Sequence, residues 1–358
     1  MQKKIKLGLI GAGRITGHHI RAIKKNNNFR IQAICDLDIL KAKKYAIENN
    51  LRFYSHYKDM CLKEKKLDAV VILTPSGMHY SHALDILHKF KKHVIIEKPT
   101  SLKTTEILQL YKSAKKIKKK IFPIFQNRYN KSISQLKKFI KNDKLGKIRL
   151  ASLQLRWCRP QRYYDLSIWR GTYSHDGGAL TNQGVHYIDL LRFLFGEIKK
   201  VNAKMKTLGA KIEVEDTVVA NLEYESGAVG SLEVTTSARP DDYGATISIV
   251  GSKGFAQIGG LAANKLEVFT PDPRLCKKYS EKIPDAYGYG HFKLYQDISD
   301  DLLKLKKFPM DKKDCYKTIQ FLNSFYVSDE KQKTILVNKV LDSKRLGRKN
   351  NKISKLYK

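Results

Sequence analysis

The stretch Lys4-Ile5-Lys6-Leu7-Gly8-Leu9-Ile10-Gly11-Ala12-Gly13-Arg14-Ile15-Thr16 joins a short apolar run to a glycine turn. The apolar run predicts a buried strand, and a helix is expected to begin after the turn. Gly11 lets the chain turn sharply, and Gly13 lets the backbone approach a pyrophosphate held by the free N–H groups of the helix. Because Thr16 replaces the third glycine of the G-x-G-x-x-G pattern, the fingerprint needs support from the residues that follow.

Asp36 supplies that support. It ends a second predicted strand, residues 30–35, close to the spacing of roughly 20 residues expected for the acid that binds the ribose. A carboxylate there accepts hydrogen bonds from the ribose hydroxyls and repels a 2′-phosphate, so Asp36 favours NAD(H) over NADP(H). The alternative is a strand, turn and helix whose glycines are incidental.

Length and composition limit the class of protein. A chain of 358 residues predicts two domains, and 42% hydrophobic residues suffice for sizeable cores. The sequence has no apolar run long enough to cross a bilayer, and glycines interrupt the apolar N-terminal segment. The five scattered cysteines form no C-x-x-C pair, which argues against a disulfide framework. We expect a cytoplasmic protein with no membrane partner.

The net charge of +35 is compatible with a nucleic-acid or membrane-surface partner. The lysines, however, occur in nearly every segment together with many asparagines and isoleucines, which a biased codon composition explains at least as well. We therefore favour a lysine-rich surface without a specific nucleic-acid partner. The tail from Lys344 onward is expected to be frayed.

Strands and helices alternate through the first third of the chain. Strands are predicted at residues 5–10, 30–35, 67–73, 93–96 and 121–125, and helices at about 16–25, 39–49, 58–65, 78–89 and 102–118. This alternation predicts an α/β fold with a doubly wound parallel sheet, in which ligands lie at the carboxyl ends of the strands.

The pattern changes after Asn130. A helix at 132–141 precedes alternating segments at 148–157, 201–207, 216–224, 228–235 and 245–250, which predict a largely antiparallel sheet. A helix at 184–195 crosses this half. We predict a dinucleotide-binding domain at 1–123 and a substrate domain at 124–358, with the active site between them.

Several spaced motifs together resemble the glucose-fructose oxidoreductase, inositol 2-dehydrogenase and rhizopine-catabolism (Gfo/Idh/MocA) family. The matching residues are 8–15 with His18 or His19 after them, Thr74-Pro75-Ser76 with His79, Glu97-Lys98-Pro99, and Gly177-Gly178-Ala179-Leu180-Thr181-Asn182-Gln183-Gly184-Val185-His186-Tyr187-Ile188-Asp189. The resemblance extends to about Val337. It implies an N-terminal Rossmann domain, a C-terminal α/β domain with a large, mostly antiparallel open sheet, bound NAD, and homodimers or homotetramers formed through that sheet.

The resemblance also implies residue roles. Lys98 would hydrogen-bond the hydroxyl that becomes a carbonyl, and His186 would be the acid/base, a division of labour that hydride transfer to nicotinamide requires. The alternatives are an ordinary surface lysine and a buried core histidine. The implied cofactor contacts are Gly11, Gly13, Arg14, Ile15, Asp36, Thr74, Pro75, His79, Glu97 and Lys98.

Asn182 departs from the family pattern, because many members carry aspartate one helical turn before the histidine. We interpret Asn182 as a substrate hydrogen-bonding group. With residues 126–130 and Trp169-Arg170-Gly171, it resembles the branch that acts on nucleotide-linked sugars, such as UDP-N-acetylglucosamine 3-dehydrogenases. Arg128 and Arg170 are candidates to grip a diphosphate or a carboxylate, and Trp169 to stack on a ring. Surface ion pairs and a core tryptophan are the alternatives.

These motifs predict an NAD-dependent dehydrogenase that oxidises a ring hydroxyl, C3 being favoured, of a nucleotide-activated amino sugar for surface polysaccharide biosynthesis. The substrate would bind between Lys98 and His186. A free sugar or inositol dehydrogenase is one alternative, and a cofactor-binding regulatory protein without turnover is another. No metal site is expected, because the histidines lack a zinc spacing.

Overall fold

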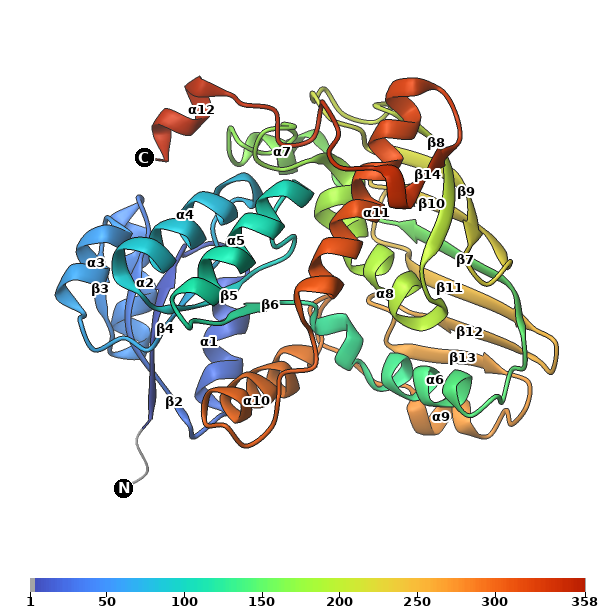
Figure 1. Cartoon of the computed structure of the whole chain (residues 1–358), viewed down its shortest axis with the longest axis horizontal. Coiled ribbons are helices and arrows are strands. Elements are labelled where there is room, and N and C mark those ends of the chain that lie inside the picture. The colour runs from blue at the N-terminus through green and yellow to red at the C-terminus, as the bar shows by residue number, and fades with distance from the viewer. Residues whose placement is uncertain (1–3, 358) are drawn as a thin grey trace.

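The computed structural model describes residues 4–357, which form two β-sheets placed side by side, with helices between and around them (Figure 1). The first sheet has six strands in the order β3-β2-β1-β4-β5-β6, and every neighbouring pair is parallel. Its strands are β1 (Ile5–Ile10), β2 (Phe29–Cys35), β3 (Arg52–Tyr54), β4 (Ala69–Ile72), β5 (His93–Ile96) and β6 (Ile121–Pro123). The predicted doubly wound parallel sheet is confirmed.

This sheet is buried on both faces. In β4, Val70 and Ile72 join one apolar cluster, whereas Val71 between them joins the cluster on the opposite face. Strands buried in this way are near-continuous apolar runs, which is the pattern that the sequence shows. The covering helices are α1 (Thr16–Lys24), α2 (Ile39–Asn49), α3 (Tyr57–Lys63), α4 (His79–Asp85) and α5 (Thr104–Lys116).

The second sheet has eight strands in the order β13-β12-β11-β7-β10-β9-β8-β14. Its pairs are antiparallel except for β7 and β10, which run parallel. The strands are β7 (Ile148–Arg156), β8 (Ile198–Lys206), β9 (Thr217–Tyr224), β10 (Val229–Thr235), β11 (Gly244–Gly251), β12 (Phe255–Gly259), β13 (Lys265–Phe269) and β14 (Ile335–Leu336). The large, mostly antiparallel sheet is confirmed, although the sequence pattern did not predict β12, β13 and β14.

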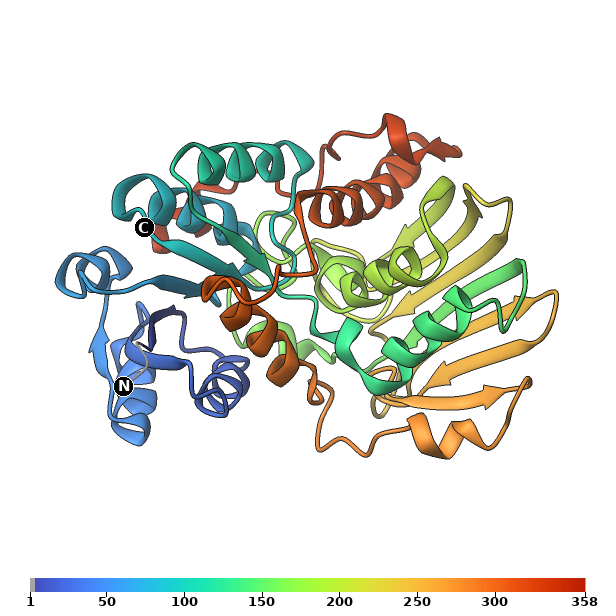
Figure 2. The same cartoon turned by 60° about the horizontal axis from the view of Figure 1, so that its bottom comes forward.

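Helices α6 (Lys131–Lys141), α8 (Val185–Phe195) and α11 (Lys312–Lys331) lie on the face of the second sheet that is turned toward the Rossmann half (Figures 1 and 2). Helix α11 was not predicted. Asp311 begins it with a capping box, because its carboxylate accepts hydrogen bonds from the N–H groups of Lys313 and Asp314. The remaining helices are α7 (Gln161–Asp165), α9 (Leu275–Tyr279), α10 (Gly290–Leu302) and α12 (Asn351–Leu356).

Helix α10 comes late in the chain but packs on the first half of the molecule (Figure 1). The Tyr295 ring meets Phe29 edge to face at 5.8 Å, and Asn26 donates to the hydroxyl of Ser299 at 3.1 Å. A domain boundary at residue 123 therefore divides the chain by sequence, but α10, which comes after this boundary, packs against α1 of the first half.

The expectation of a frayed tail is wrong. Leu346 is fully buried, and the N–H of Gly347 donates to the carbonyl of Tyr173 at 2.8 Å. Arg345 forms an ion pair with Asp329 at 2.7 Å. The apolar anchors are single residues between lysines and arginines, so composition alone concealed them.

Within residues 4–357, every helix falls short of the length and apolar character that a membrane span requires. All five cysteines are free thiols, as the scattered spacing indicated.

Candidate active site

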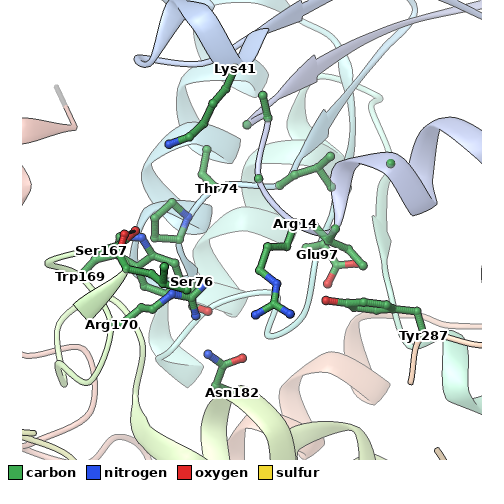
Figure 3. A pocket seen from close by; sticks show the side chains of 18 of the residues that line it. Arg14, Lys41, Thr74, Ser76, Glu97, Ser167, Trp169, Arg170, Asn182 and Tyr287 are labelled. Atoms are coloured by element: carbon green, nitrogen blue, oxygen red, sulfur yellow. Dashed lines mark hydrogen bonds between the residues drawn. The ribbon is translucent and has the colours of Figure 1, made fainter. Parts of the chain in front are cut away.

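A cavity of about 1760 Å³ opens at the carboxyl ends of the parallel strands (Figure 3). One wall belongs to the Rossmann half and the other to the segments around α7 and the start of α8. The sequence-predicted residues that line it are Gly11, Gly13, Arg14, Ile15, Asp36, Thr74, Pro75, His79, Glu97, Lys98, Trp169, Arg170, Asn182 and His186. Arg128 is the one predicted site residue that does not.

The glycine turn fits a dinucleotide. Gly11 has a φ of +104°, and a Cβ atom there would lie 2.7 Å from the carbonyl oxygen of Leu73. At Gly13 a Cβ atom would meet nothing within 4 Å, so the backbone faces open space in front of α1. A pyrophosphate can approach the first N–H groups of α1 there.

Asp36 is held at the rim of the same cavity by the backbone. One carboxylate oxygen accepts from the N–H of Ala12 at 2.7 Å, and the other accepts from the N–H of Asp38 at 2.9 Å. Each oxygen keeps a second lone pair, which is the arrangement that two ribose hydroxyls need.

His79 joins two cavity loops. Its Nδ1 lies 2.7 Å from the carbonyl oxygen of Pro99, and its Nε2 lies 2.8 Å from that of Thr74. Burial lowers its pKa. Both ring nitrogens thus face backbone carbonyls, and the neutral imidazole, which has one N–H, donates to one of the two carbonyls at a time while it packs between Thr74 and Pro99.

The Glu97 carboxylate fixes the loop that carries Lys98. One oxygen accepts from Nε2 of His19 at 2.9 Å, and the other accepts from the N–H of Lys98 at 2.9 Å. Although burial opposes ionisation, the hydrogen bond with His19 and the nearby His291, whose Nε2 lies 3.7 Å from the carboxylate, hold the pKa of Glu97 well below its usual range. The nearest ligand atoms of His19, Glu97 and His291 lie within 4.8 Å of one another. Glu97 is thus an ionised anchor for the lysine.

Lys98 reaches across to the second half of the molecule. Its Nζ donates to the carbonyl oxygen of Asn182 at 2.7 Å. Burial lowers the pKa of this ammonium, and the charges of Glu97 and Asp176 oppose that shift. The hydrogen bond therefore holds the lysine next to Asn182, which faces the cavity (Figure 3).

Asp176 was not predicted as a site residue, yet it supports Asn182. The side-chain amide of Asn182 donates to one Asp176 oxygen at 2.5 Å, and the N–H of Gly171 donates to the other at 2.7 Å. Burial raises the pKa of Asp176. The Asp176 carboxylate thus supports Asn182 from the side away from the cavity. Its position directly before Gly177-Gly178 was the signal in the sequence that could have identified it.

His186 stands in the first turn of α8 with an unusual environment. Its Nδ1 is buried and finds no hydrogen-bond partner among the residues that the structure describes, while Nε2 lies 3.5 Å from Nε2 of Gln126. Burial, with a smaller contribution from the Lys98 charge, lowers its pKa to about 3. The imidazole is neutral at physiological pH, and its low pKa makes it a weak base that can take a proton only from a group that becomes strongly acidic during the reaction.

A glycine turn and one π-helical turn (Leu180–Gly184) set the start of α8. Gly177 and Gly178 have φ values of +84° and +79°, which side chains rarely adopt. A Cβ atom on Gly178 would lie 2.3 Å from the carboxylate of Glu215, which accepts from the N–H of Leu180 at 3.1 Å. The helix that carries His186 is thus fixed at its beginning by glycine conformation and by Glu215.

Arginines gather around Tyr163 on the substrate side. The Arg170 guanidinium lies 4.3 Å from the centre of the Tyr163 ring and 4.6 Å from that of Trp169. Arg14 and Arg159 approach the Tyr163 ring at 6.0 Å and 5.4 Å. Figure 3 shows Arg14 pointing into the cavity toward Asn182. Sequence reasoning missed Arg159 and Tyr163, although the mixed basic and aromatic run 157–164 was a signal.

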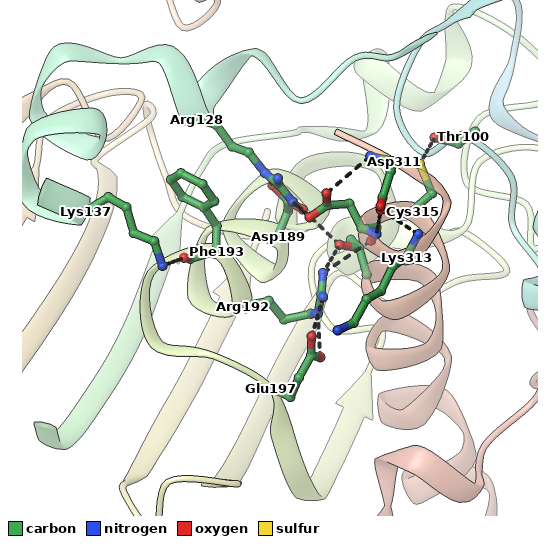
Figure 4. A network of polar contacts seen from close by, with 12 residues as sticks. Thr100, Arg128, Lys137, Asp189, Arg192, Phe193, Glu197, Asp311, Lys313 and Cys315 are labelled. Carbon is green, nitrogen blue, oxygen red and sulfur yellow. Dashed lines mark hydrogen bonds and ion pairs between the residues drawn. The ribbon is translucent and has the colours of Figure 1, made fainter. Parts of the chain in front are cut away.

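Arg128 does not reach the substrate, so that prediction is wrong. Its guanidinium binds both oxygens of Asp189, at 2.6 and 2.7 Å, and one oxygen of Asp314 at 3.0 Å (Figure 4). Its Nε and Nη2 are thus used in joining α8 to α11. A bidentate geometry that suits a phosphate suits a carboxylate equally well, and sequence alone could not distinguish the two.

A glycine-turn dinucleotide site with a lysine from the same Rossmann half, facing a histidine from the second domain, defines a nicotinamide-dependent oxidoreductase. Residues 5–125 match a family described as "Oxidoreductase family, NAD-binding Rossmann fold", and residues 133–257 match the "GFO/IDH/MocA C-terminal domain". The chain belongs to the Gfo/Idh/MocA oxidoreductase family, and its cofactor is NAD.

Solved structures give a more detailed comparison. The WlbA dehydrogenase of Bordetella pertussis, solved with NADH and UDP-GlcNAcA, is 32% identical with a TM-score of 0.88, covering 94% of this chain and 98% of that one. The WlbA dehydrogenase of Chromobacterium violaceum, with the same ligands, is 32% identical with a TM-score of 0.86, covering 94% and 96%. Myo-inositol 2-dehydrogenase of Thermotoga maritima is 26% identical, covering 70% of this chain and 74% of that protein.

Proposed function

We propose that this NAD-dependent oxidoreductase oxidises the C3 hydroxyl of a nucleotide-activated amino sugar that carries a carboxylate, of the UDP-GlcNAcA type, for surface polysaccharide biosynthesis. The observation that carries the proposal is Arg170. Its Nε is buried and has no hydrogen-bond partner within residues 4–357, and it stands beside Arg14 and Arg159 at the Tyr163 ring. Such a cluster requires an anionic ligand, because like charges repel.

Two relatives with NADH and UDP-GlcNAcA bound support this choice. A diphosphate and a sugar carboxylate would supply negative charge to Arg14 and Arg170, whereas Arg159 already forms an ion pair with Asp242 at 2.8 Å. Trp169 offers a ring face beside Arg170. The Nη1 of Arg170 donates to the hydroxyl of Tyr163 at 2.5 Å, whereas its buried Nε has no partner, and a neutral polyol would bring no charge to that nitrogen.

The chain's own residues account for the chemistry around a ring hydroxyl. Bound NAD supplies the hydride acceptor. Lys98, fixed by Glu97 and Asn182, donates to the hydroxyl oxygen and stabilises the developing negative charge there. His186 is neutral and accepts the hydroxyl proton. Asn182, held by Asp176, orients the sugar beside Lys98.

The alternative is a free sugar or inositol dehydrogenase, which the identity to myo-inositol 2-dehydrogenase favours. Lys98 and His186 would serve any ring hydroxyl, so they do not discriminate between the two functions. The arginine cluster favours the nucleotide sugar, because the hydroxyls of a neutral polyol can accept hydrogen bonds but bring no negative charge to the guanidinium groups.

The test is NAD reduction with UDP-GlcNAcA, UDP-GlcNAc, myo-inositol and glucose, each with and without 2-oxoglutarate to recycle bound NADH. We expect turnover of UDP-GlcNAcA that Lys98→Ala abolishes, whereas the exposed Lys112→Ala, as the matched control, leaves it intact. Arg170→Gln should raise KM for the UDP-sugar about tenfold, the equivalent of one lost charge-assisted contact. Arg156→Gln, a surface arginine outside the cavity, is its control. Activity on myo-inositol alone would contradict the proposal.

We further propose a homodimer or homotetramer formed through the face of the eight-stranded sheet that α6, α8 and α11 leave uncovered. Val219 and Val229 are exposed on neighbouring strands β9 and β10. Light scattering of the purified protein would measure the assembly. A Val219→Lys variant should shift it toward monomer, and an unchanged mass would contradict this interface.

A further inference from the structure

The segment of residues 340–357, called the strap below, leaves the second half of the molecule and returns to the Rossmann half. Figure 1 shows α12 above α4, while the preceding chain comes from the region beyond α11. The strap is anchored at several points and reaches the cavity.

The first anchor is on α5 of the Rossmann half. One Asp342 oxygen accepts from the N–H of Thr104 at 2.5 Å and from its hydroxyl at 2.8 Å, and the other accepts from the hydroxyl of Thr105 at 2.6 Å. Thr104 begins α5, so Asp342 satisfies the free donors of that helix as a capping residue would. A carboxylate is also favoured by the positive end of the helix dipole.

The second anchor is on the glycine turn that precedes the catalytic helix. Leu346 is fully buried, and a Cβ atom on Gly177 would lie 2.7 Å from its Cδ1. The neighbouring Gly347 donates its N–H to the carbonyl of Tyr173 at 2.8 Å. The middle of the strap therefore packs directly on the backbone that leads to Asn182 and His186.

The strap ends at the cavity. Asn350 caps α12 by accepting from the N–H of Ile353 at 3.2 Å, and Ile353 is buried. Tyr357 follows α12 and lines the cavity, with its ring 6.0 Å from that of His175. Burial and the negative charge of Asp36 raise the pKa of Tyr357. The phenol therefore lies within electrostatic reach of the carboxylate that faces the ribose.

We propose that the strap closes the cavity over bound NAD(H), with Tyr357 as its contact to the dinucleotide, so that the cofactor leaves only when residues 340–357 lift. The anchors on α5 and on the glycine turn belong to the two halves of the molecule between which the cavity opens, and the strap connects them. The Tyr357 ring, which lines the same cavity as Asp36, provides a flat apolar surface for the cofactor. The inference rests on NAD binding and does not depend on the identity of the sugar.

The test is the rate of NADH release, measured by stopped-flow fluorescence without sugar. We expect Tyr357→Ala to release NADH about fivefold faster and to bind it correspondingly more weakly, because loss of one aromatic contact acts mainly on dissociation. Leu356→Ala is the matched control, since Leu356 is exposed on the same helix and lies outside the cavity lining. It should release NADH at the rate of the unaltered protein.

A second variant keeps the tyrosine and weakens the anchor. Asp342→Asn retains the shape of the cap and removes its charge, so release should accelerate by a smaller factor while Tyr357 is unchanged. Melting curves establish that each variant is folded. NADH release that is the same in Tyr357→Ala, Asp342→Asn and the unaltered protein would overturn the proposal, and turnover of any sugar would be irrelevant to that outcome.

Discussion

At the scale of single residues, the site places a lysine ammonium next to a neutral histidine. Lys98 and His186 share one buried pocket, and burial lowers the pKa of each. The carbonyl oxygen of Asn182 accepts from the ammonium, whereas the imidazole stays neutral because of its burial and the nearby Lys98 charge. One group can therefore stabilise an alkoxide while the other accepts its proton.

Asp36 carries a prediction at the same scale. Asp36→Ser removes the carboxylate that repels a 2′-phosphate, so the ratio of kcat/KM for NAD over that for NADP should fall by at least about tenfold. The ratio is measured from initial rates with each cofactor. Asp38→Ser is the control, because Asp38 caps α2 and is not expected to contact the ribose. A natural preference for NADP would contradict the assignment.

At the scale of elements, two buried groups fix α8. Arg128 ties it to α11 through Asp189 and Asp314, and Glu215 supports the turn before it. The sequence alone could not predict these interactions, because the residues that pair with Arg128 and Glu215 lie far away along the chain. The predicted strands and helices of the Rossmann half follow from local apolar periodicity. The parallel pairing of β7 and β10, by contrast, depends on tertiary arrangement.

Arg128→Met should destabilise the protein by about 3–5 kcal/mol, because it leaves Asp189 buried without a cation. The free energy of unfolding in urea measures this. KM for the sugar should change little in the folded fraction, since the guanidinium lies outside the cavity lining. The double variant Arg128→Met with Asp189→Leu should recover much of the loss, and a variant as stable as the original protein would contradict the role.

Glu215 makes stability depend on pH. Burial raises its pKa to about 8, whereas an ordinary glutamate has 4.5. Between these values the folded state binds a proton that the unfolded chain has released, so the free energy of unfolding falls as pH rises through this window. Glu215→Gln keeps the hydrogen-bonding shape and removes the ionisation, so its melting temperature should fall less between pH 6 and pH 8. Equal slopes for both proteins would contradict the shift.

At the scale of the whole molecule, charge and cavity act together. The net charge is +35, and Arg14, Arg159 and Arg170 add cations inside the cavity. A field of one sign that focuses into a cleft accelerates the capture of an oppositely charged ligand. The sequence supplied the total charge, but its concentration around Tyr163 required the fold, since 157–170 meets Arg14 only in space.

A higher ionic strength should therefore lower the rate of the enzyme at low substrate concentration. We expect kcat/KM for the UDP-sugar to fall at least about threefold from 0.01 M to 0.15 M ionic strength, where the Debye length shortens from about 30 Å to about 8 Å. Initial rates at several salt concentrations measure this, and kcat at saturating sugar serves as the internal control. A kcat/KM independent of salt would exclude electrostatic capture.

The packing of α10 on α1 has a consequence for how the chain is made. Tyr295 hydrogen-bonds His19 at 2.7 Å and covers Phe29, so the apolar surface around α1 is completed only by residues near 300. On a ribosome, the dinucleotide-binding half would emerge first but lack this helix for most of translation. Contacts so distant in sequence slow folding and leave apolar surface open to chaperones. The nascent Rossmann half thus depends on the other half of the chain to become native.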